Sequence, residues 1–143
     1  MEIEQYALIV HLTTVFLLGA TVIGTDMLGL AWLLGKVATL PFRVMRTLHR
    51  MVWTGLILML LSGGTMFLSY REYLLSVPAF YIKITFVITL IVNAFFIGKH
   101  MGIASTRSFS SLTRAERLPL LISGAVSTVA WIGTISAALM LGL

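Results

Sequence analysis

The chain of 143 residues contains no cysteine, only three prolines and few charged residues. The lack of cysteine excludes disulfides, thiolate metal ligands and a cysteine nucleophile. Charged residues make up 10% of the chain, whereas roughly 25% is usual in water-soluble domains. Hydrophobic residues make up 59%, and the mean hydropathy is +1.02. This composition excludes an ordinary water-soluble domain and predicts a membrane protein.

Four long apolar segments cover residues 5–35, 44–70, 78–99 and 118–141. A helix of about 20 mostly apolar residues crosses the hydrocarbon core of a bilayer, and each segment reaches that length. No basic region precedes the first segment, where Glu2 and Glu4 stand instead, so we interpret it as a retained span and not a cleaved signal peptide. We therefore predict one all-α domain over residues 1–143, a transmembrane four-helix bundle with up-down-up-down topology.

Basic residues concentrate at one end of this predicted bundle. We call the end with the connection 71–77 and both termini side A, and the end with the other two connections side B. Side A carries Arg71, Glu2, Glu4 and Glu72, and side B carries Lys36, Arg43, Arg46, Arg50, Lys99, Arg107, Arg114 and Arg117.

Lys and Arg accumulate in cytoplasmic connections. The charge pattern therefore predicts a multi-pass protein of a bacterial-type inner (cytoplasmic) membrane, with side B in the cytoplasm and both termini outside. This orientation accounts for most of the net charge of +5, so we expect the lipid bilayer and no nucleic acid as a partner.

Ionisable side chains inside the spans are candidate functional residues, because each costs at least about 2.5 to 3.5 kcal/mol on insertion scales. Alternation of the helix directions places His11 and Lys83 at a similar depth near side A. It places three other ionisable residues, Asp26, His49 and His100, nearer side B, together with the amide of Asn93.

Histidines level with one another on antiparallel helices are typical of membrane sites that ligate haem b. At side A, His11 would be the ligand, with Lys83 as a propionate partner or second ligand. At side B, His49 and His100 would share the iron. The plainer interpretation is that the histidines are interfacial or hydrogen-bonded to neighbouring helices and that Lys83 extends its ammonium to the interface.

Three short motifs resemble a superfamily of small membrane proteins. They are Ile9–Leu12 with its early histidine, Arg46–Trp53 followed by Gly55, and Phe80–Lys83 at the start of the third span. In this order they resemble HemJ-type protoporphyrinogen oxidases and the membrane domain of copper resistance protein D. The HemJ resemblance implies haem b, with His11 and Lys83 as the corresponding histidine and lysine.

The chain also differs from the HemJ pattern, because it lacks a Leu-Pro-Arg run after the first-span glycine and carries Asp26 in that region. It is similar in addition to four-span bacterial proteins with a Gly-Ala-Thr stretch followed by Asp, here 19–21 and Asp26, and a Ser-Gly pair in the second span, here 62–63. From the resemblance we therefore expect haem binding but not porphyrinogen oxidation.

We accordingly predict a membrane haem b protein that serves electron transfer or haem-linked redox chemistry, which would make it an oxidoreductase. A homodimer or a redox partner in the membrane is consistent with so small a bundle. One alternative is proton or metal-ion transport along a polar path formed by Asp26, Lys83 and Asn93. A second is a small structural or partner-binding subunit whose buried polar residues fix helix register.

Overall fold

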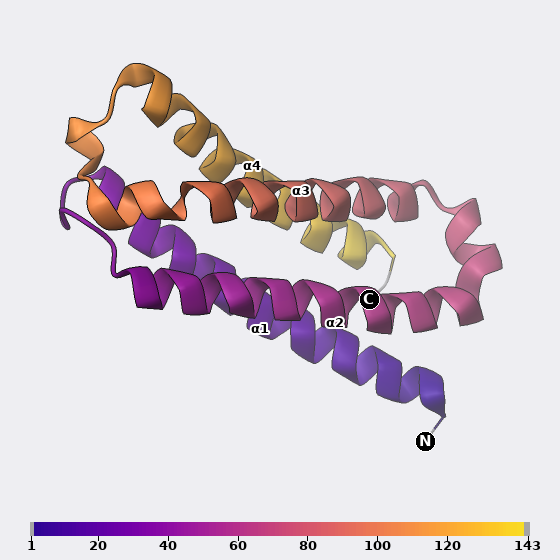
Figure 1. Ribbon diagram of the computed structural model, residues 1–143. Helices are drawn as coiled ribbons and strands as arrows, with labels where there is room; N and C mark the ends of the chain where they lie inside the picture. Colours follow the sequence, from indigo (N-terminus) through magenta and orange to yellow (C-terminus); the bar gives the residue numbers. More distant parts are fainter. Residues whose placement is uncertain (1, 142–143) are drawn as a thin grey trace.

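The computed structural model in Figure 1 describes residues 2–141 of the chain. This part folds into four long helices, α1 (Ile3–Leu33), α2 (Phe42–Ser76), α3 (Pro78–Thr106) and α4 (Arg114–Met140), with a short 3-10 turn, η1 (Phe109–Ser111). All four helices are long and apolar enough to cross a membrane. The prediction of an all-α bundle of four membrane-spanning helices is confirmed.

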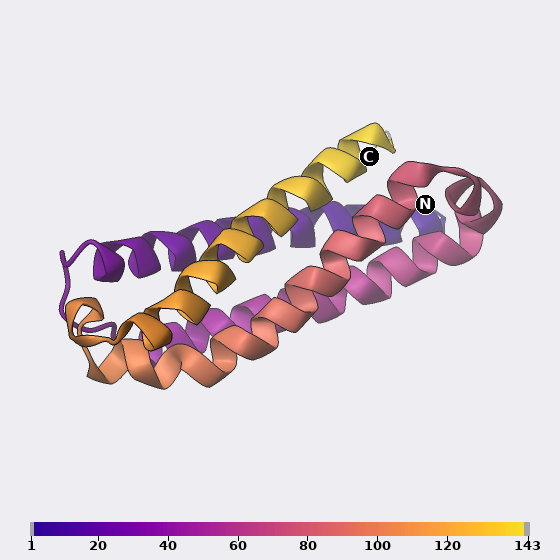
Figure 2. The same ribbon diagram turned by 90° about the horizontal axis from the view of Figure 1, so that it is seen from above.

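The helices lie in two pairs. α2 and α3 form an antiparallel hairpin at the front of Figure 1, and α1 and α4 lie behind it. α1 packs on α2, α4 packs on α3, and α2 and α3 pack on each other. Seen from above, both termini and the α2–α3 connection lie at one end, and the other two connections lie at the opposite end (Figure 2). These two ends are the sides A and B of the predicted topology.

The helix ends differ from the predicted spans mainly at α2 and α3. α2 continues beyond a kink at Tyr70 (φ −115°, ψ 18°) as far as Ser76, so that almost no loop separates it from α3. Val77 is extended, as residues before proline usually are, and Pro78 begins α3. α3 then runs to Thr106, past the predicted end at residue 99. The polar connection to α4 is consequently shorter than the sequence suggested.

The start of α4 is fixed by a capping box. The Thr113 hydroxyl accepts a hydrogen bond from the Glu116 backbone N–H at 3.3 Å, and the Glu116 carboxylate accepts one from the Thr113 N–H at 3.2 Å. Arg107 forms an ion pair with the same carboxylate. Glu116 lies before the apolar segment that starts at Leu118. Hydrogen bonds to its carboxylate from the Thr113 N–H, then the Thr113 hydroxyl and then Arg107 hold its pKa below the usual range.

At side B, hydrogen bonds join the end of α1 and the α1–α2 connection to the end of α3. The Trp32 indole N–H donates to the Arg107 carbonyl at 2.9 Å, and the Leu40 N–H donates to the Ala104 carbonyl at 2.8 Å. Trp32, Leu40 and Ala104 are buried in one apolar cluster with Leu112. The helices are therefore held together at this end both by hydrogen bonds and by packing.

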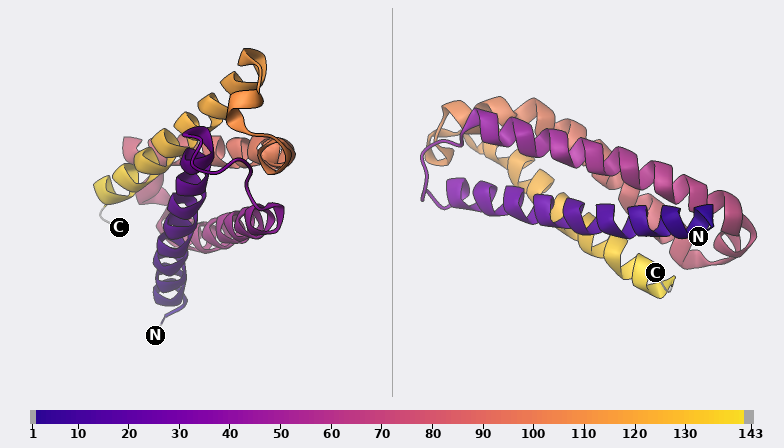
Figure 3. Two further views of the ribbon diagram at one scale, coloured as in Figure 1. Left: turned by 90° about the vertical axis from the view of Figure 1, so that its left-hand side faces the viewer. Right: turned by 90° about the horizontal axis from the view of Figure 1, so that it is seen from below.

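The central core forms where α1 and α4 cross, a crossing visible in Figure 2 and in the right-hand view of Figure 3. Trp131 of α4 packs so close to α1 that a Cβ atom at Gly19 would lie 3.1 Å from its ring. Leu18, Leu56 and Leu90 are buried around this contact. Beyond the crossing, the ends of α1 and α4 at side A point in different directions (Figure 3, left). Divergence of the helices leaves room for a cavity at side A.

Candidate functional site

A chamber of about 730 Å³ lies at side A. Residues of α1, α2 and α3 line it, and Leu141 borders it from the end of α4. The volume is in the range of about 300 to 1,000 Å³ typical of small-molecule and cofactor sites. Both side A candidates, His11 and Lys83, line this chamber, together with mostly apolar neighbours that include Leu8, Met59, Phe67, Phe80 and Ile84.

His11 is held in a defined orientation by Ser62 of α2. The imidazole is only 5% exposed, and its Nδ1 lies 3.0 Å from the Ser62 Oγ. The Ser62 hydroxyl lies 2.8 Å from the Leu58 carbonyl and 3.2 Å from the Met59 carbonyl, and when it donates to either of them its oxygen accepts from the Nδ1–H tautomer of His11. In that tautomer the free lone pair of the neutral imidazole is on Nε2.

The residue after Ser62 provides space for the ring. A Cβ atom at Gly63 would lie 3.3 Å from the His11 Cε1, whereas one at Gly64 would meet nothing within 4 Å. In the sequence, Ser62 and Gly63 stood out only as the Ser-Gly pair of the second span. The sequence signal that could have predicted the contact between His11 and Ser62 is their depth in the membrane. Ser62 lies about two turns before Tyr70 and His11 about two turns after Gln5, so the hydroxyl and the imidazole lie at the same level.

Lys83 of α3 is half-buried in the same chamber and forms no ion pair with any of the described residues. Two carboxylates, Glu2 and Glu4, line the chamber where α1 begins. Glu4 is engaged there by Tyr70, whose hydroxyl donates to it at 3.3 Å and links the side A ends of α1 and α2. The chamber thus combines a histidine, a primary amine and apolar walls.

The side B histidines lie in different surroundings. His49 is half-buried, and its Nε2 accepts a hydrogen bond from the Trp53 indole N–H at 3.1 Å. The Nδ1 of His100 lies 2.7 Å from the Phe96 carbonyl of its own helix. His49 lines a second cavity of about 50 Å³, and His100 is not among the described residues that line it. This volume is far below what a flat macrocycle needs.

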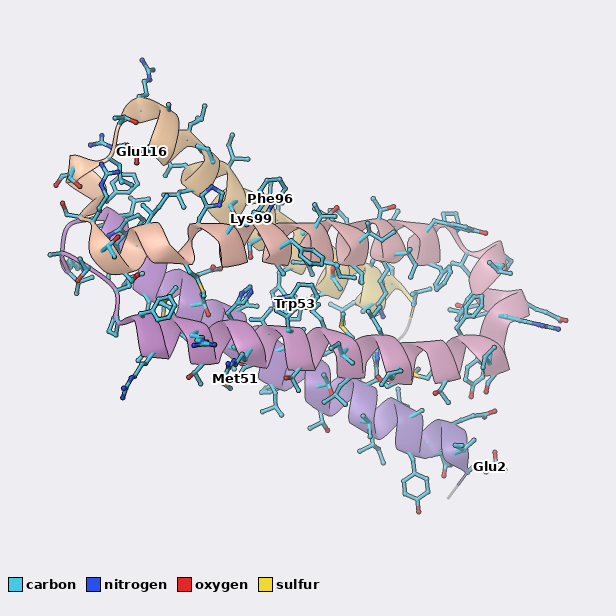
Figure 4. All side chains as sticks on the ribbon, viewed as in Figure 1. Glu2, Met51, Trp53, Phe96, Lys99 and Glu116 are labelled. Carbon is cyan, nitrogen blue, oxygen red and sulfur yellow. The ribbon has the colours of Figure 1, made fainter. Side chains whose placement is uncertain are left out.

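Some of the apolar residues near these two histidines face away from the interior of the bundle. Trp53 lies between α2 and α3 in Figure 4 and contacts Phe95 with 4.8 Å between ring centroids. Met51 and Phe96 lie on the outward sides of α2 and α3, where they are 50% and 53% exposed. In a bilayer these two side chains face lipid.

The residues of the alternative polar path are divided between the two cavities. Asp26 and Asn93 line the small cavity, and Lys83 lines the chamber. Asn93 is also occupied as a link between α3 and α4, because its amide donates to the Ser123 carbonyl at 3.1 Å and accepts from the Ser123 hydroxyl at 2.8 Å. Within residues 2–141, no three His, Asp or Glu side chains gather as a metal site.

Comparison of the chain with models of protein families, with curated proteins and with solved structures finds no match. The candidate site is therefore defined by its own geometry. Its parts are the chamber, the oriented imidazole of His11 and the amine of Lys83.

Proposed function

We propose that this membrane protein binds haem b in the side A chamber, with His11 as a ligand of the iron, and that it serves electron transfer or haem-linked redox chemistry. The observation that carries the proposal is the orientation of His11, which lines a chamber of about 730 Å³ and whose Nδ1 lies 3.0 Å from the Ser62 hydroxyl, so that Nε2 is the ring nitrogen left to bind a metal. Histidines that ligate metals usually donate their other ring N–H to a neighbouring acceptor in this way.

The residues present fit the chemistry of the cofactor. Neutral imidazole is a common axial ligand of haem iron, and the apolar walls suit a macrocycle. Lys83 supplies the positive charge that a propionate would need in a chamber that also contains Glu2 and Glu4. Lys83 could alternatively serve as the second ligand.

Each part of the chain then has a defined task. Ser62 fixes the tautomer and ring orientation of His11, Gly63 leaves space for that ring, and Lys83 orients an anionic group. Haem would supply one-electron redox chemistry when bound, at a potential set by the axial ligand and by burial.

The location of the protein belongs to the same proposal. Basic residues at side B favour a bacterial-type inner membrane with side B in the cytoplasm and both termini outside. The chamber would then open toward the outer face of that membrane. A redox partner in the membrane, or a second copy of the chain, would exchange electrons there.

An absorption spectrum of the purified protein tests the proposal. After expression with added haem precursor, we expect a Soret band and, on reduction, α and β bands. The variant His11→Ala should lose the bands, and Lys83→Ala should bind haem more weakly. The variants His49→Ala and His100→Ala serve as controls and should keep the spectrum.

A pair of neighbouring glycines adds a finer control. Gly63→Ala should alter the Soret band or weaken haem binding because its methyl group would meet the His11 ring, whereas Gly64→Ala should not. A colourless wild-type protein would refute haem binding. Bands that survive in His11→Ala but vanish in His49→Ala or His100→Ala would refute the assignment to side A.

A further inference from the structure

The small cavity near side B collects polar side chains from all four helices. Asp26 comes from α1, His49 from α2, Asn93 from α3 and Ser127 from α4. The cavity measures about 50 Å³ and shares none of its described lining residues with the side A chamber. It is therefore a separate polar site inside the bundle, outside the proposed haem site.

Two of these four polar groups have defined partners, and the Thr25 hydroxyl, which also lines the cavity, donates to the Thr21 carbonyl at 2.8 Å. The Asn93 amide is engaged by Ser123. The Trp53 indole can only donate, so His49 Nε2 is an acceptor and a neutral His49 ring carries its proton on Nδ1. This Nδ1–H makes no hydrogen bond to a residue of the described chain.

The other two groups have no partner within residues 2–141. Neither the Asp26 carboxyl nor the Ser127 hydroxyl makes a hydrogen bond to protein there, although Ser127 is only 7% exposed. Polar groups that line a cavity with enough room are satisfied there by ordered water. A cavity needs about 10 to 15 Å³ to admit one water molecule, and this one is several times larger.

We propose that water fills this cavity, connecting Asp26 with the Nδ1–H of His49 and the hydroxyl of Ser127, and that Asp26 and His49 together form a proton-binding site inside the membrane. Among the residues that line the cavity, these two are the only ones that titrate, because α3 contributes Asn93 and α4 contributes Ser127. A proton taken up from solution at side B would be shared by the pair, so the two groups titrate as a coupled unit.

Close packing holds His49 at this site. A Cβ atom at Gly98 of α3 would lie 3.0 Å from the His49 Nε2, whereas one at Gly102, a turn further on, would meet nothing within 4 Å. Gly98 therefore allows the ring to lie against the α3 backbone beside the cavity. Sequence reasoning did not single out Gly98 or Ser127 for this region.

Infrared spectroscopy of the haem-free protein in liposomes tests the proposal. The C=O stretch of a protonated carboxyl should appear as the pH falls, vanish in Asp26→Asn, and shift rapidly on transfer to D₂O because water reaches the group. In His49→Ala its titration midpoint should move by about one pH unit or more. His100→Ala, which changes a side B histidine outside the cavity, should leave the midpoint unchanged.

Two results would overturn the proposal. One is a wild-type Asp26 band that does not respond to D₂O, which would mean that the cavity is dry. The other is a midpoint that is the same in His49→Ala as in the wild type, which would mean that the two groups are not coupled. Gly98→Ala and Gly102→Ala give a second comparison, in which only the former should move the midpoint. None of these measurements depends on haem.

Discussion

The contact between Gly133 of α4 and Phe86 of α3 predicts a specific effect of one added methyl group. A Cβ atom at Gly133 would lie 2.5, 2.6 and 2.7 Å from the Cε2, Cζ and Cδ2 atoms of Phe86. Carbon atoms in ordinary contact are about 3.5 to 4.0 Å apart, so in Gly133→Ala the ring would have to retreat by about 1 Å. Because Cζ lies on the axis about which the ring turns, rotation about χ2 cannot relieve the contact with this atom.

The expected magnitude follows from two opposing effects. Overpacking of a core typically costs about 1 to 3 kcal/mol, while replacing a helical glycine by alanine gains about 1 kcal/mol of helix propensity. Gly124 lies on the same helix, and a Cβ atom there would meet nothing within 4 Å. Gly124→Ala should therefore show only the stabilisation from the higher helix propensity of alanine. The free energies of unfolding of the two variants should differ by about 1 to 3 kcal/mol, or about 5- to 150-fold in the equilibrium constant.

The assay is reversible unfolding in mixed micelles with increasing SDS, followed by far-UV circular dichroism. The double variant Phe86→Leu/Gly133→Ala should be more stable than the sum of the single changes predicts, because removal of the ring relieves the clash. Equal stability of Gly133→Ala and Gly124→Ala would refute the reasoning. Strict additivity in the double variant would show that Phe86 is not the group that opposes the methyl.

Three further predictions concern the α3–α4 pair and its connection. A double-mutant cycle of Asn93→Ala and Ser123→Ala should give a coupling of about 0.6 to 1.7 kcal/mol, the average and the maximum measured for interhelical hydrogen bonds in a membrane protein; zero coupling would contradict the hydrogen bond between the two side chains. Thr113→Ala should lower the free energy of unfolding by about 0.5 to 2 kcal/mol because α4 loses its N-cap, and an unchanged SDS midpoint would contradict this. The pKa of Glu116 is lowered in the folded state, so its stabilising effect is present above its unfolded pKa and is lost as the pH falls through the folded pKa. Glu116→Gln should therefore show a smaller loss of stability on acidification than the wild type, and parallel pH profiles would argue against it.

Local signals along the chain determined much of the architecture. Segment length and hydropathy predicted four spans, because a bilayer requires each backbone polar group to be satisfied within its own helix. The capping box at the start of α4 is also a local signal, since it depends only on Thr113 and Glu116, which are three positions apart. The same local signals did not reveal that α2 and α3 extend past the apolar segments. Outside the lipid, water solvates polar side chains, so a helix can continue where the hydropathy signal ends.

The depth of a residue in the membrane could also be estimated from its position along a span. That estimate placed His11 and Lys83 at one level, and both line the side A chamber. It also placed His49 and His100 near side B, but depth alone could not decide whether their side chains face one cavity. The structure assigns His49 to the small cavity and His100 to a contact with its own helix.

What only the tertiary structure decided is the rotation of each helix about its axis. In a water-soluble helix, the apolar stripe identifies the buried side, but a membrane helix is apolar all round and its lipid-facing and core-facing sides look alike in sequence. The sequence therefore determined the number, direction and depth of the helices. The pairing of His11 with Ser62 and the separation of His49 from His100 depend on packing between helices, which residues close in the chain do not specify.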